Sequence, residues 1–112
     1  MPAFGGSYFL NADKHMNQED FVFTIGYQGG TAIVDGQSKK KYGKLSLDEL
    51  IEKKLFKSAF RYSLFSEDTE GMEKVVSAYR EESGNPDITA RTLKRLFGVF
   101  SAPDEETKTK VI

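Results

Sequence analysis

The side chains of this chain that could take part in catalysis or metal binding form no recognisable motif. Cysteine is absent and His15 is the single histidine, which excludes thiolate catalysis, a disulfide framework and zinc sites with sulfur ligands. Asp13 lies two residues before His15, but two ligands do not make a metal site. We therefore predict no catalytic residue, no metal and no cofactor. An enzyme or ligand-binding domain built on carboxylates and tyrosines stays an alternative, because carboxylate pairs form in space.

A glycine-rich stretch at residues 26–30, Gly-Tyr-Gln-Gly-Gly, has the composition of a phosphate-binding loop. It lacks the Lys-Ser/Thr that ends a nucleotide-binding loop, and a strand pattern follows it where that loop needs a helix N-terminus. A hairpin turn explains these glycines better, since Gly29 and Gly30 can adopt the positive φ of a two-residue turn.

Four lysines in six residues form the densest basic run of the chain: Lys39, Lys40, Lys41 and Lys44. Lysines neutralise phosphates and Tyr42 lies among them, so the run is a candidate contact for nucleic acid. The alternative, which we favour, is a solvated turn or an edge strand that its lysines protect from aggregation.

A second basic group, Arg91, Lys94 and Arg95, falls opposite the apolar positions of a C-terminal helix. With the helix and turn before it, the fragment 88–96 resembles the recognition helices of bacterial repressors. That resemblance implies basic side chains in the major groove of DNA. The connection from Ala78 to Ile88 is longer than in those repressors, and the preceding helix is acidic. We favour an amphipathic core helix with a solvated cationic face.

Charge changes sign in blocks along the chain, although the net charge is only -1. Residues 36–61 contain eight Lys/Arg against three Asp/Glu, and residues 62–90 contain seven acids against two bases. Such blocks pair within the fold, pair between copies in an oligomer, or present a basic face to an anionic partner.

The elements that position these groups begin with a hairpin. Phe21, Phe23, Ile25 and Tyr27 alternate with smaller or polar residues, which predicts a strand with one buried face. A turn at residues 29–30 sets Tyr27 opposite Ala32, and Ile25 opposite Val34. Asp35-Gly36 is a second turn signal, after which residues 37–42 are predicted as a third, solvent-facing strand.

Three helices are predicted after the hairpin. Ser46 and Glu49 form a capping box for a helix that runs to about Phe56. Residues 57–66 fit a strand or a helix, and we favour the helix. Asp68 or Thr69 begins the second clear helix, which Gly84 stops. Thr89 begins the third, with Leu93, Leu96, Phe97 and Phe100 inward, Ile88 stapled on Leu93, and an end at Ala102-Pro103.

These patterns predict an α+β fold, with an N-terminal β-hairpin or small antiparallel meander packed against about three α-helices. We expect one domain over residues 1–103 and a flexible tail over 104–112. No apolar run is long enough for a membrane span and no secretory signal is recognised, so a cytoplasmic location is expected.

For function we favour a small non-enzymatic binding or regulatory module that acts through protein–protein contact or self-association, with a homodimer possible through the hairpin edge. The first alternative is nucleic-acid binding through the lysine run and the basic C-terminal helix. That alternative requires both basic groups on one surface.

Overall fold

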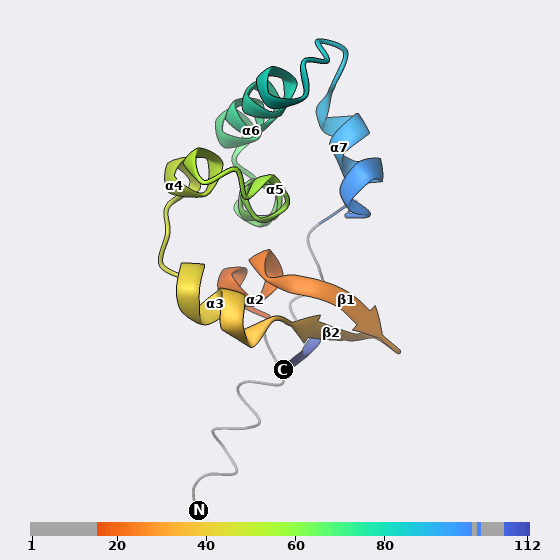
Figure 1. Ribbon diagram of the computed structural model, residues 1–112. Coiled ribbons are helices and arrows are strands. Elements are labelled where there is room, and N and C mark those ends of the chain that lie inside the picture. The colour runs from red at the N-terminus through yellow and green to blue at the C-terminus, as the bar shows by residue number, and fades with distance from the viewer. Residues whose placement is uncertain (1–15, 100, 102–106) are drawn as a thin grey trace, which may run out of the picture. The chain divides into compact units, whose positions relative to one another are not determined.

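The computed structural model describes residues 16–99, 101 and 107–112, and it confirms the α+β class (Figure 1). The chain divides into two compact units. The described residues of the first are 16–43 and 107–112, and those of the second are 44–99 and 101. The single domain expected over residues 1–103 stays a prediction.

A three-stranded sheet forms the centre of the first unit, with β1 (Thr24–Gln28), β2 (Thr31–Val34) and β3 (Lys108–Val111) in that order. The β1–β2 hairpin is antiparallel, and Tyr27 lies opposite Ala32 as predicted. Gly29 and Gly30 have φ of 58° and 94°, the positive values that a two-residue hairpin turn requires. The third strand is not part of a meander, because β3 pairs with β2 in parallel.

The predicted buried strand face over residues 21–27 is wrong. Phe21 lies in a short helix, α2 (Gln18–Val22), which begins where the Asn17 side chain accepts a hydrogen bond from the Asp20 amide. An irregularity in β1 then sets Thr24, not Ile25, opposite Val34. The side chains of Ile25 and Tyr27 are therefore 54% and 55% exposed, whereas Thr24 is buried.

The predicted third strand at residues 37–42 is also wrong, since Gly36–Tyr42 forms helix α3. The Asp35 carboxylate accepts hydrogen bonds from the amides of Gln37 and Ser38, so Asp35 caps a helix instead of opening a turn. Residues 108–111, expected within a flexible tail, form β3. The Ile112 amide donates to the Val34 carbonyl, and the Ile112 carbonyl accepts from the Gly36 amide.

Four helices make up the second unit: α4 (Leu47–Glu52), α5 (Phe56–Phe65), α6 (Thr69–Ser83) and α7 (Ala90–Phe97). The capping box of Ser46 and Glu49 begins α4 as predicted. This helix ends before the predicted Phe56, because Lys54 adopts a positive φ of 61°. Residues 57–65 are helical, as favoured. Gly84 ends α6 in the left-handed conformation.

The core of the second unit joins all four helices. Its largest fully buried apolar side chains are Leu50, Phe60, Val75, Val76 and Leu93, each at most 2% exposed. Among the helices that the structure describes, none has the length and apolar character that crossing a membrane requires.

Candidate functional site

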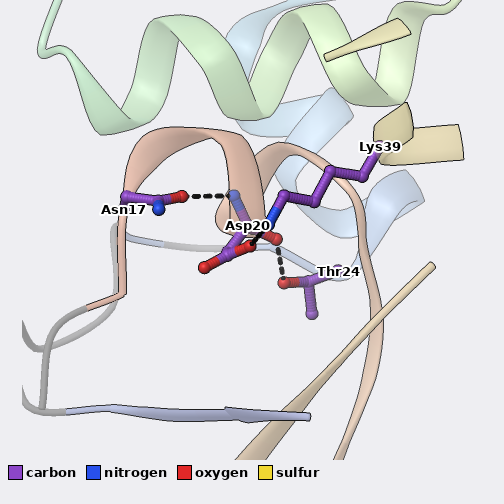
Figure 2. A network of polar contacts seen from close by, with 4 residues as sticks. All are labelled: Asn17, Asp20, Thr24 and Lys39. Carbon is purple, nitrogen blue, oxygen red and sulfur yellow. Dashed lines mark hydrogen bonds and ion pairs between the residues drawn. The ribbon is translucent and has the colours of Figure 1, made fainter. Parts of the chain in front are cut away.

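The predicted lysine run does not form one uniform surface. Lys39 lies in the last turn of α3, and its Nζ is 2.6 Å from Oδ1 of Asp20 in α2. Figure 2 shows this ion pair beside Asn17 and Thr24, which hydrogen bond to the backbone of Asp20. The Asp20 side chain is only 9% exposed. Lys39 therefore joins two helices of the first unit, and phosphate contact would compete with that ion pair.

The other three lysines of the run are exposed: Lys40, Lys41 and Lys44. The Lys41 ammonium lies 5.3 Å from the centre of the Tyr42 ring, a cation–π contact. Lys44 belongs to the second unit, whereas Lys40 and Lys41 belong to the first. The run is therefore divided between the two units.

The second predicted group lies on one short helix, α7, whose ends are both defined by local contacts. The Thr89 hydroxyl accepts from the Thr92 amide, and the Thr92 hydroxyl accepts from the Thr89 amide, which completes a capping box. Gly98 ends the helix with φ of 69°. The predicted end at Ala102-Pro103 is wrong, because this left-handed residue stops the helix first.

Only part of the predicted inward face of α7 is buried. Leu93 is fully buried and Ile88, the residue before the cap, is 7% exposed. Leu96 is 57% exposed, so its predicted inward position is wrong. Phe97 is half-buried, and Phe100 lies outside the described residues.

Arg91, Thr92, Arg95 and Leu96 form an exposed surface that we call the α7 face. An open hollow of about 620 Å³ is lined by these four residues and Thr89. A second hollow of about 460 Å³ is lined by Ala90, Arg91, Lys94 and Arg95. Arg91, Lys94 and Arg95 form no ion pair with any residue that the structure describes. The α7 face thus combines free cations with an apolar side chain.

A chain of aromatic contacts fixes α7 against α5 and α6. The rings of Phe56 and Tyr79 meet edge to face with centres 5.2 Å apart, and Tyr79 meets Phe97 at 5.9 Å. Phe60 contacts Phe97 at 5.6 Å. The Arg80 Nε also donates to the Ile88 carbonyl at 2.7 Å, which ties α6 to the residue before the α7 cap. The α7 face therefore belongs to a helix that is packed against both α5 and α6.

The helix pair α6 and α7 has the order of a helix-turn-helix, but its charges differ from those of a DNA-binding pair. The N-terminal end of α6 contains Asp68 as its cap and Glu70 in its first turn. In repressors the first helix crosses the DNA backbone, and carboxylates there repel phosphates. The helix pair exists, and its use in DNA binding stays a prediction.

Among the residues that the structure describes, the pKa is shifted at Asp35, Glu49 and Lys57, none of which lies on the α7 face. Burial lowers the pKa of Lys57, and the nearby Arg61 guanidinium adds to this effect. Hydrogen bonds from Ser38 lower the pKa of Asp35, and those from Ser46 lower the pKa of Glu49. Both carboxylates accept hydrogen bonds at a helix N-terminus, Asp35 as the cap of α3 and Glu49 within the capping box of α4, and these bonds favour the charged form.

No group of three or more His, Asp or Glu side chains that could hold a metal occurs among the described residues. Asp13 and His15 lie outside them. Comparison with protein-family models, curated proteins and solved structures found no match to this chain.

Two features of these surfaces were not predicted from the sequence. The partner of Lys39 is 19 positions away, at Asp20, and no local pattern links them. No sequence pattern indicated that Leu96 is exposed, because its spacing from Leu93 is typical of a buried helical stripe.

Proposed function

We propose that this chain is a small binding module that holds an acidic protein partner against the α7 face. The observation that supports this most directly is the exposure of Leu96 beside Arg91 and Arg95, with hollows on the same surface. Interfaces combine an apolar centre with charged surroundings, and arginine is enriched in them.

An acidic amphipathic helix fits this surface in its chemistry. Arg91 and Arg95 are one helical turn apart, so their side chains project from the same side of α7. Each guanidinium can bind a carboxylate through two parallel hydrogen bonds. An apolar side chain of the partner would cover Leu96 and remove it from water.

Nucleic acid fits the described residues less well. Within the lysine run, Lys39 is engaged in the ion pair with Asp20, so phosphate contact there would compete with that pair. The Leu96 side chain cannot bind a phosphate, and the acidic first turn of α6 repels the phosphates of a DNA backbone.

The test is fluorescence anisotropy with a labelled synthetic acidic amphipathic helix that has leucine and glutamate on one face. The variant Arg91→Glu/Arg95→Glu is expected to weaken binding at least about tenfold, because two attractive contacts become repulsive. The matched control Lys40→Glu/Lys41→Glu makes the same change of charge in the first unit and is expected to stay within about twofold of the parent.

A labelled random DNA duplex is the second probe. Tight, salt-sensitive binding of the duplex that both variants abolish would replace the proposed function with nucleic-acid binding. Equal binding of the peptide to the parent and to the α7 variant would overturn the role of the α7 face.

A further inference from the structure

Helix α6 presents two exposed glutamates on one side, with the exposed Lys74 beside them. Glu73, Ser77 and Glu81 follow one another at intervals of four residues and are all exposed, so they lie along one side of the helix. We call these three residues the α6 face. With a rise of 1.5 Å per residue, Glu73 and Glu81 are about 12 Å apart along the axis.

The ion pairs of the second unit leave this surface unneutralised. Lys54 contacts Glu82 at 3.1 Å, and Lys74 contacts Asp48 at 3.4 Å. Neither pair includes a residue of the α6 face or of the α7 face. Both pairs join the basic block of residues 36–61 to the acidic block of residues 62–90, but among the described residues no ion pair includes Glu73, Glu81, Arg91 or Arg95.

We propose that the acidic partner of the α7 face is the α6 face of a second copy of this chain. This inference rests on the proposed function, because it names the partner that the α7 face binds. Charge complementarity supports it: two exposed glutamates on one helix match two exposed arginines on another. Both faces are regular helical surfaces, so two rows of side chains can meet.

The charges of the two faces are spaced differently, and the length of the arginine side chains can bridge the difference. Arg91 and Arg95 are about 6 Å apart along α7, and their long side chains can spread towards glutamates about 12 Å apart. Ser77 lies between the glutamates, and its small side chain leaves space for the two guanidinium groups. Leu96 lies at the edge of the α7 face, about 100° around the helix from Arg95, so covering it would add an apolar contact beside the ion pairs.

In the proposed dimer, a two-fold axis sets the α7 face of each copy against the α6 face of the other. Each copy has one α6 face and one α7 face, so a dimer of this kind makes the same contact twice. The two contacts act together, because formation of the first holds the second pair of faces close.

Sedimentation equilibrium of the full chain over a range of concentrations tests this inference. The parent is expected to exceed the monomer mass of 12.6 kDa as concentration rises, and to return to it in high salt. Two charge-reversed variants, Arg91→Glu/Arg95→Glu and Glu73→Lys/Glu81→Lys, are each expected to associate at least about tenfold more weakly. A far-UV circular dichroism spectrum like that of the parent and a cooperative unfolding transition show that both remain folded.

The decisive sample is an equimolar mixture of the two variants. In a mixed pair every contact again joins opposite charges, so association is expected to return to within about threefold of the parent. A mixture that stays monomeric would overturn the inference, as would a dimer that neither variant weakens. A monomeric parent whose α7 face still binds the acidic peptide would refute self-association and leave the proposed function standing.

Discussion

The ion pair between Lys39 and Asp20 predicts a clear difference between adjacent lysines. Replacing Lys39 with methionine keeps the length of the side chain and removes its charge, which leaves the Asp20 carboxylate without its cation. Lys40→Met is the matched control, since Lys40 is exposed on the same helix and forms no ion pair with a described residue.

The magnitude follows from the exposure of the two side chains. The Asp20 side chain is 9% exposed and the Lys39 side chain 28%, so the pair is neither fully buried nor on the open surface. Breaking a buried pair costs about 3–5 kcal/mol, whereas exposed pairs contribute about 0.2–1 kcal/mol. We expect Lys39→Met to lower the free energy of unfolding by about 2 kcal/mol, and Lys40→Met by less than about 0.5 kcal/mol.

Urea unfolding followed by circular dichroism measures both values. Asp20→Asn and the double variant complete a thermodynamic cycle, in which a coupling energy above about 1 kcal/mol is expected. Equal effects of Lys39→Met and Lys40→Met, or a coupling energy near zero, would refute the assignment of Lys39 as the residue that joins α2 and α3.

Three further predictions concern the fold around the two surfaces. Gly36→Ala places a Cβ 2.5 Å from the Ile112 carbonyl oxygen and 2.9 Å from Val111, so faster hydrogen exchange of the Ile112 amide is expected. Gly26→Ala is the control, because a Cβ there meets no atom within 4 Å. Unchanged exchange at Ile112 in the Gly36 variant would contradict the packing of β3. Leu93→Ala is expected to cost about 2–5 kcal/mol and Leu96→Ala less than about 0.5 kcal/mol in urea unfolding, so similar losses would show that Leu96 is buried. The lowered pKa of Asp35 means that its charged form stabilises the folded state, so this stabilisation is present at neutral pH and is lost as pH falls through the range below 3.8. In Asp35→Asn the Tm is expected to fall less steeply with decreasing pH than in the parent. Parallel curves of Tm against pH would contradict the role of the Asp35 charge.

Features fixed by neighbouring residues were predicted from the sequence. The capping box of Ser46 and the cap at Thr89 depend on contacts within three positions, and the hairpin depends on Gly29 and Gly30. Each of these signals is local, so one sequence is enough to recognise it.

Features that depend on distant contacts were not predicted. The pairing of β3 with β2 sets Lys108 opposite Thr31, and no sequence pattern in either strand indicates that the two strands pair. Asp35-Gly36 is compatible with a turn and with a helix cap, and the hydrogen bonds of the Asp35 carboxylate decide between them. The basic residues of α7 were predicted, but Leu96 was not, because its exposure depends on how α7 packs.

The claim that the α7 face is the binding surface is tested most directly by NMR titration of the ¹⁵N-labelled full chain with the acidic amphipathic helix. The amide signals of Arg91, Thr92, Arg95 and Leu96 are expected to shift together, while those of residues 39–44 stay in place. Shifts confined to residues 39–44, or no shifts on α7, would contradict that claim.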